Sequence, residues 1–91
     1  METIKVRDVD HHDGDFNIIT KVLRVKKTFA LGEASKKKVE FEGGDETGTA
    51  IFVVNALRFI KAGAVMMISR AKVYSFHGTR QIQQQHKNSH L

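Results

Sequence analysis

The sequence predicts an all-β fold: a five-stranded Greek-key barrel with one short helix between its third and fourth strands. Stretches rich in β-branched residues have the length of strands rather than of long helices. Polar segments that contain glycine separate them. A chain of 91 residues suits one domain, and closing its sheet into a barrel removes open strand edges. We therefore expect one domain over residues 1–85 and a flexible tail over residues 86–91.

The first half of the chain contains three of these strands. Residues 16–25 form a long uninterrupted β-branched stretch, and the polar segment 31–38 that follows it is expected to be a connecting loop. Residues 39–42 alternate between apolar and acidic side chains, as a half-buried strand does. A turn over residues 43–46 then leads into a strand over residues 47–54.

The second half predicts the helix and two further strands. Asn55 is suited to cap a two-turn helix over residues 55–61, which Gly63 would end. Residues 64–68 form a short apolar strand, and residues 71–85 form a fifth strand with a turn or bulge at residues 77–78. Three strands, a helix and two strands are the plan of the OB fold. An SH3-like barrel is the nearest alternative, but it usually lacks a helix at this point.

Charge is unevenly distributed along the chain. The net charge is +5, yet residues 21–38 alone hold seven basic side chains and one acidic one. Beyond Glu46 the sequence contains no carboxylate side chain. If the fold brings these two basic regions together, they form a patch suited to a polyanion, whereas scattered lysines would only aid solubility.

Several short motifs, in this order, give the chain a likeness to a known family. The most specific is DETG at residues 45–48, which leads into a strand; glycine before a strand at residue 63 and Phe-x-Gly at residues 76–78 support it. With residues 6–9, 21–25 and 71–78, they span about residues 4–85. The pattern resembles the simple single-stranded-DNA-binding OB proteins, which include the OB domains of replication protein A and the small single-stranded-DNA sensor proteins.

The resemblance implies a ligand face on the second and third strands and their neighbouring loops. It places Lys21 as a basic residue facing the groove and Phe76 as a stacking aromatic. Where the family tends to have further aromatics, this chain has Val54, Lys72 and Gln83, which leaves Tyr74, Phe76 and Phe29 to stack on bases. The candidate nucleic-acid-binding residues are Lys21, Arg24, Lys26, Lys36, Lys37, Lys38, Arg70, Lys72, Tyr74, Phe76, Arg80, Gln81 and Gln83.

Other hydrophobic residues are expected to be structural. We expect Phe59 on the predicted helix to plug one end of the barrel. Tyr74 is one residue out of phase with Val73 and is therefore expected on the outer surface. The expected core residues are Phe41, Phe52, Met66, Val73 and Ile82.

The sequence argues against a catalytic or metal-binding role. It has no cysteine, which excludes disulfides and thiolate metal sites. The run DHHDGD at residues 10–15 contains metal-binding residue types and an Asp-His-His signature of phosphoesterases, but the further motifs and larger α/β domain of those enzymes are missing, so a polar turn is the better account. Nucleophile and phosphate-loop motifs are also missing. We expect no enzyme, no metal and no cofactor.

The sequence also limits location and partners. Its start is too polar for a signal peptide, and no apolar run approaches the about 20 residues of a membrane helix. We expect an intracellular protein, in the nucleus or cytoplasm with an organelle left open, without a membrane or small-molecule partner.

We therefore expect the chain to bind single-stranded nucleic acid, DNA or RNA, as a subunit of a larger complex. One OB domain with few stacking aromatics covers few nucleotides, and linked modules raise avidity. The alternative is an OB-fold adaptor that binds other protein subunits or a second copy and has little nucleic-acid affinity. The apolar tract 64–68 favours this alternative, because an exposed methionine face would suit a protein partner.

Overall fold

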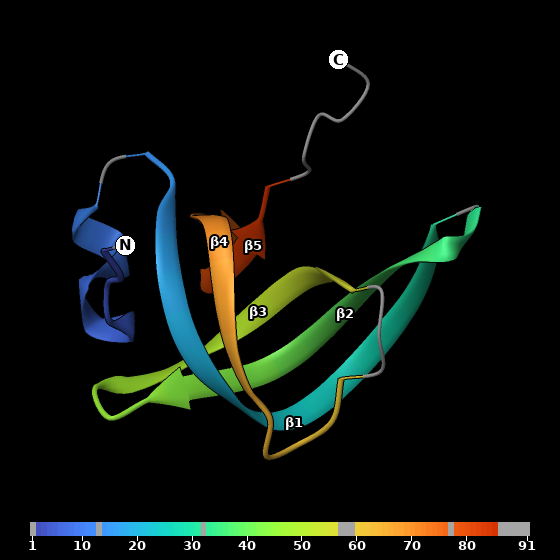
Figure 1. The fold of residues 1–91 in the computed structure, drawn as a ribbon. Helices are drawn as coiled ribbons and strands as arrows, with labels where there is room; N and C mark the ends of the chain where they lie inside the picture. The colour runs from blue at the N-terminus through green and yellow to red at the C-terminus, as the bar shows by residue number, and fades with distance from the viewer. Residues whose placement is uncertain (1, 13, 32, 57–59, 77, 86–91) are drawn as a thin grey trace.

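The computed structural model describes residues 2–12, 14–31, 33–56, 60–76 and 78–85. The predicted tail, residues 86–91, lies outside them. One 3-10 helix and five strands follow one another along the chain (Figure 1). Their bounds are η1 Val6–His11, β1 Phe16–Leu31, β2 Glu33–Asp45, β3 Gly48–Ala56, β4 Val65–Phe76 and β5 Thr79–Gln84.

The five strands close into a barrel in the order β1-β2-β3-β5-β4. β1 is long enough to pair with two neighbours: Phe16 to Lys21 pair with β4, and Lys21 to Leu31 pair with β2. Neighbouring strands are antiparallel except β3 and β5, which run parallel. The prediction of a five-stranded all-β barrel is confirmed.

β1 and β2 are longer than predicted and extend beyond the rest of the barrel as a two-stranded arm (Figure 1). The expected loop over residues 31–38 is wrong, because β2 begins at Glu33 and Lys37 and Lys38 pair with Ala30 and Phe29. An arm that projects from the barrel has no core to cover, so its sequence lacks the alternation that marks a half-buried strand.

The predicted helix over residues 55–61 is also wrong where the structure describes that stretch. Asn55 and Ala56 belong to β3, and the Asn55 N–H donates to the Gln84 Oε1 at 3.1 Å instead of starting a helix. Residues 57–59, and with them the expected plug Phe59, lie outside the described residues. The short helix that the structure does contain is η1, near the N-terminus.

The boundary between the last two strands differs from the prediction. Residues 65–76 form the single strand β4, which continues through residues 69–71 instead of breaking there, and β5 begins at Thr79. Arg70 has a left-handed φ of 57°, and the pairing with β1 shifts register at this point. The strand bends at this bulge but continues.

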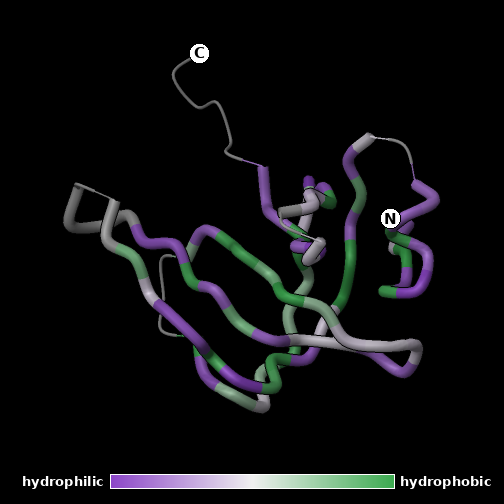
Figure 2. The backbone as a smooth tube through the Cα atoms, turned by 180° about the vertical axis from the view of Figure 1, so that it is seen from behind, coloured by the Kyte–Doolittle hydropathy of each residue, from purple (hydrophilic) through white to green (hydrophobic). Residues whose placement is uncertain are grey.

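The core lies inside the barrel. Phe41 and Phe52 stack there with ring centroids 5.2 Å apart, Ile82 is fully buried beside them, and Met66 and Val73 pack against this cluster. The five residues predicted for the core are therefore confirmed. Hydrophobic residues, which include those of the core, recur along the strands among hydrophilic ones (Figure 2).

The tightest point of the core is at Gly43, which was predicted in a turn but belongs to β2. A Cβ at Gly43 would lie 2.6 Å from Thr20 Oγ1 and 2.8 Å from Phe41 Cε1. Glycine therefore allows β2 to pass close to β1. The turn itself consists of Glu46 and Thr47, between the paired residues Asp45 and Gly48.

η1 closes the end of the barrel that carries the β2–β3 turn. Its residues Val6 and Val9 are fully buried in the core. The Asp45 carboxylate accepts the Val6 N–H at 2.9 Å, and Thr47 Oγ1 accepts the Arg7 N–H at 3.1 Å. The DETG motif therefore has a structural use, since its side chains fasten the N-terminal segment to the barrel.

Candidate nucleic-acid interface

The register of the strands brings predicted site residues together on the outside of the barrel. One row crosses the sheet from β1 to β4, because Arg24 pairs with Glu42, Glu42 with Ile51, Ile51 with Gln81, and Gln81 with Tyr74. We call this the first row. It joins five strands whose members are far apart in sequence.

A second row runs beside the first. Glu40 pairs with Val53, Val53 with Gln83, and Gln83 with Lys72. Lys26 joins this row through its ion pair with Glu40. Together the first and second rows form what we call the row face, which is centred on β3.

The row face carries apolar side chains on β3, at its middle, and one aromatic ring at its β4 edge. Ile51 and Val53 are half-buried, and so is Tyr74 at the β4 side. Gln85 Nε2 donates to the Tyr74 hydroxyl at 3.0 Å, which holds the ring in place. An aromatic ring is a surface on which unpaired bases stack, and Ile51 and Val53 add apolar area near it.

The charges of the row face are partly paired. Arg24 Nε lies 3.8 Å from Glu42 Oε1, and Lys26 Nζ lies 3.9 Å from Glu40 Oε2. Both ion pairs are long, and the side chains other than that of Glu40 remain substantially exposed, so they contribute little to stability. Three basic and two acidic side chains leave the row face with a net charge of +1. The two cations at the β1 side and Lys72 at the β4 side lie on either side of the apolar residues of β3.

The arm extends the row face with further lysines. Lys38 pairs with Asn55 on β3, two positions from the Glu40–Val53 pair, and Lys37 is exposed next to it. Phe29 is 40% exposed on the facing strand, with Lys27 Nζ 6.0 Å from its ring centroid. The side chain of Lys36 lies outside the described residues.

Other predicted site residues do not join the rows. Arg80 forms an ion pair with Asp10 near the N-terminal helix, and Arg70 is exposed at the β4 bulge. The side chain of Phe76 lies outside the described residues. Its position on β4 is known, because Phe76 pairs with Thr79.

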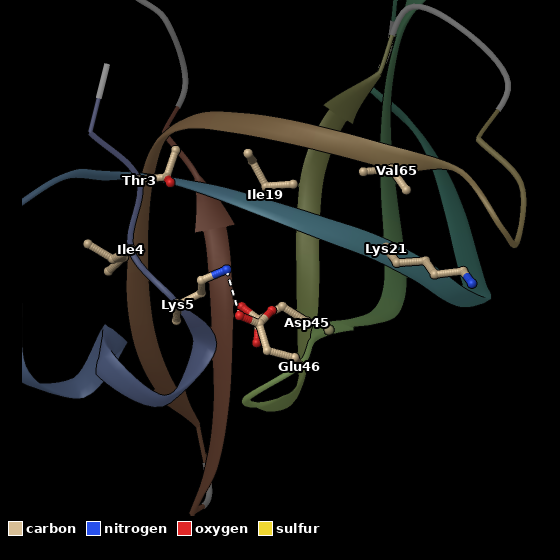
Figure 3. Close-up of a pocket in the computed structure, with 9 residues that line it drawn as sticks. Thr3, Ile4, Lys5, Ile19, Lys21, Asp45, Glu46 and Val65 are labelled. Atoms are coloured by element: carbon tan, nitrogen blue, oxygen red, sulfur yellow. Dashed lines mark ion pairs between the residues drawn. The ribbon is translucent and has the colours of Figure 1, made fainter.

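Lys21 lies in a separate place, at a pocket of about 210 Å³ (Figure 3). It pairs with Val65 of β4 and Gly44 of β2, and its side chain points away from the ion pair between Lys5 and Glu46 at the other side of this pocket. A hydrogen bond and the opposite charge of Glu46 raise the pKa of Lys5, and the same contact lowers that of Glu46. The full lining is Thr3, Ile4, Lys5, Ile19, Lys21, Gly44, Asp45, Glu46 and Val65.

Sequence reasoning missed four members of the row face: Glu40, Glu42, Ile51 and Val53. The alternation of residues 39–42 did predict that Glu40 and Glu42 face outward. Their ion pairs with β1 follow from the strand register, which the alternation does not give.

The run DHHDGD is dispersed by the structure as far as it is described. Asp10 belongs to η1 and pairs with Arg80, whereas the His12 ring meets the Phe16 ring edge-on at 5.6 Å. Within the described residues, no three His, Asp or Glu side chains are grouped so as to hold a metal ion. Nor does that part of the chain contain a helix long and apolar enough to cross a membrane.

Comparison with known proteins identifies the fold. No protein-family model matches the chain, and no curated protein is significantly similar to it. An OB domain from Thermoplasma acidophilum, solved by NMR in solution, superimposes with a TM-score of 0.69 over 91% of this chain and 78% of its own length, at 19% sequence identity. This likeness shows that the barrel has an OB fold.

Proposed function

We propose that this protein binds single-stranded nucleic acid across the row face, in a binding rather than a catalytic role. The observation that carries the proposal is the arrangement of Ile51 and Val53 on β3, between Arg24 and Lys26 at the β1 side and the ring of Tyr74 next to Lys72 at the β4 side. Bases would pack on the middle, and phosphates would lie near the flanking cations. The basic arm would lie over one end of the bound strand.

The row face is small and nearly neutral, which supports a modest affinity. Only one described aromatic ring lies on it, and Glu40 and Glu42 compete with phosphates for Arg24 and Lys26. Linking such a domain to others raises the overall affinity without new contacts. We therefore propose that it acts as a subunit of a larger complex.

The experiment is a fluorescence-anisotropy titration with poly-dT and poly-U oligonucleotides of about 15 nucleotides, a length that covers one OB fold. Salt at about 50 mM and about 200 mM separates phosphate contacts from other contacts. We expect Tyr74→Ala to weaken binding about tenfold through lost stacking, and Tyr74→Phe to retain binding. Lys72→Glu should weaken binding mainly at the lower salt concentration.

The matched control is Lys61→Glu, which reverses an exposed charge outside the two rows. It should change the affinity by less than about twofold. Folding of each variant is checked by circular dichroism. A folded wild-type protein that binds neither oligonucleotide at the lower salt concentration would disprove the proposal. Equal losses in Lys72→Glu and Lys61→Glu would show that binding is not localised to the row face.

A further inference from the structure

We propose that a second surface, on β1 and β4, docks a short acidic amphipathic helix of a protein partner. This surface, which we call the β1–β4 patch, consists of Ile19, Leu23, Val65 and Met67. It lies on a part of the barrel wall that the two rows do not include, so the inference does not depend on the proposed nucleic-acid binding.

The β1–β4 patch exposes most of its apolar surface. Its side chains are 48%, 44%, 69% and 51% exposed in the order Ile19, Leu23, Val65 and Met67. Ile19 pairs directly with Met67, and the next outward pair is Lys21 with Val65. Leu23 continues the outer side of β1. Four large apolar side chains gathered at one place on a small domain indicate a contact surface.

On β4, the exposed apolar side chains all lie on the outer face of the barrel. Met66 and Ile68 point inward and pack in or against the core, whereas Val65 and Met67 alternate with them and point outward. The barrel therefore does not need Val65 and Met67 for its core. Methionine adapts its shape to different partners, which suits a docking surface.

A cation lies between the apolar side chains. Lys21 is exposed and forms no ion pair with any residue that the structure describes. The nearby carboxylates are already engaged: Glu46 pairs with Lys5, and Asp45 accepts hydrogen bonds from Val6 and Thr47. The unpaired Lys21 therefore favours a partner with a carboxylate at this place, because covering an unpaired charge is costly.

The adjoining pocket of about 210 Å³ gives the contact an anchor (Figure 3). Ile4, Ile19 and Val65 form its apolar part and Lys21 lies beside them, whereas Asp45 and the Lys5–Glu46 ion pair lie at the other side. A cavity of about 150 Å³ already holds a benzene molecule, so this pocket has room for one large apolar side chain of the partner. An apolar anchor with a carboxylate beside it matches the pocket and Lys21 together.

The same geometry decides the form of the partner. β1 and β4 pair with each other along the patch, so no strand edge is open there to accept an added strand. A helix, in contrast, can lay apolar side chains on this face. A second copy of the chain fits poorly, because a two-fold contact would bring together two patches that each carry an unpaired Lys21, between molecules of charge +5.

The test uses NMR chemical-shift mapping of the ¹⁵N-labelled protein with synthetic helical peptides of about five turns, or roughly 18 residues. The first peptide has Leu at i, i+3, i+4 and i+7 with flanking Glu. The second peptide replaces every Glu by Lys, and the third scrambles the order. We expect the first peptide to shift amides of residues 18–24 and 64–68, and the other two to bind at least about tenfold more weakly.

Two variants complete the test. Lys21→Glu should weaken binding of the Glu peptide about fivefold or more and improve binding of the Lys peptide. Met67→Ser removes apolar contact without reaching the core, so it should weaken binding of the Glu peptide and leave oligonucleotide affinity unchanged.

Four results would overturn the inference. These are no shifts with the Glu peptide at millimolar concentration, shifts on the row face instead, equal binding of the Lys peptide, and self-association that Met67→Ser abolishes. Failure of oligonucleotide binding with intact peptide binding would disprove the proposed function but leave this inference standing.

Discussion

The Asp45 carboxylate accepts the backbone N–H of Val6 at 2.9 Å, across 39 positions of the sequence. The same carboxylate accepts the backbone N–H and the hydroxyl of Thr47, at 2.8 Å and 2.5 Å. One side chain therefore fixes the tight β2–β3 turn and holds η1, with its buried Val6 and Val9, against the end of the barrel.

Removal of the Asp45 carboxylate should destabilise the fold. Asp45→Ala leaves the half-buried Val6 N–H without its acceptor, and we expect the free energy of unfolding to fall by about 1–3 kcal/mol in a urea titration. The matched control is Glu46→Ala at the adjacent, exposed position, where the loss should be clearly smaller than in Asp45→Ala, because an exposed ion pair contributes little to stability. Equal losses of unfolding free energy in both variants would show that the hydrogen bonds of Asp45 are not the cause of the destabilisation.

Asp45 should also make stability depend on pH. Burial raises the pKa of its carboxyl, but the hydrogen bonds from Thr47 and Val6 and the nearby Lys5 outweigh burial and lower the pKa below its usual value. A lowered pKa in the folded state contributes stability above the unfolded value of about 4, and this stability is lost as pH falls through the folded value. The urea midpoint should therefore be lower at pH 3 than at pH 6, because the Asp45 carboxyl takes up a proton in the unfolded chain at a higher pH than in the folded protein.

The assignment of this pH dependence to Asp45 rests on a variant. Asp45→Asn should be less stable than the wild type at pH 6 and should show a smaller drop on acidification, whereas Glu46→Gln should keep most of the wild-type drop. An Asp45→Asn protein with the wild-type pH profile would contradict this account.

The close passage of β2 past β1 predicts a second stability effect. Gly43→Ala would press a methyl group against Thr20 and Phe41, and we expect a loss of about 1–3 kcal/mol in the free energy of unfolding. Gly48→Ala is the control, because its Cβ would meet Val6 Cγ1 at an ordinary 3.7 Å. Thermal unfolding of both variants measures the difference, and a neutral Gly43→Ala would show that β2 can move aside.

Removal of a glutamate from the row face should raise the oligonucleotide affinity. Glu42→Gln removes the carboxylate that faces Arg24 and leaves Arg24 to a phosphate, so oligonucleotide affinity should rise by about twofold to fivefold at about 50 mM salt and less at higher salt. Glu46→Gln, in the turn, removes the same charge away from the row face and should have little effect. A weaker-binding Glu42→Gln would place the nucleic acid elsewhere.

The fold was predictable where its core imposes a pattern. Residues 39–42 alternate because Phe41 is buried and Glu40 and Glu42 are not, and β3 was predicted within two residues at either end. The arm was not predictable in this way, because the run of lysines at residues 36–38 shows no alternation of apolar and polar residues, although Lys37 and Lys38 belong to β2 and pair with β3. The prediction of a helix after residue 54 was wrong for another reason. Asn55 is suited to cap a helix, but its pairing with Lys38 of β2 keeps it in β3.

The sequence predicted several residues of the candidate site but not how they are arranged. Lys72, Tyr74, Gln81 and Gln83 were named from the sequence and do lie side by side on the row face. Lys21, named with them, lies at the pocket instead. Which side chains meet depends on how far each strand is shifted along its neighbour, and bulges in β1 after Val22 change that shift.

The barrel is closed by a short seam, and this has a consequence for its internal motions. Among the described residues, three pairs join β3 to β5, fewer than join any other two neighbouring strands. Such a seam opens locally at less cost than global unfolding, so its amides should exchange with solvent sooner than those between β2 and β3. Residues of both rows form this seam, namely Ile51, Val53, Gln81 and Gln83. A strand of nucleic acid bound across the row face would therefore hold β3 and β5 together and slow the hydrogen exchange of the seam amides.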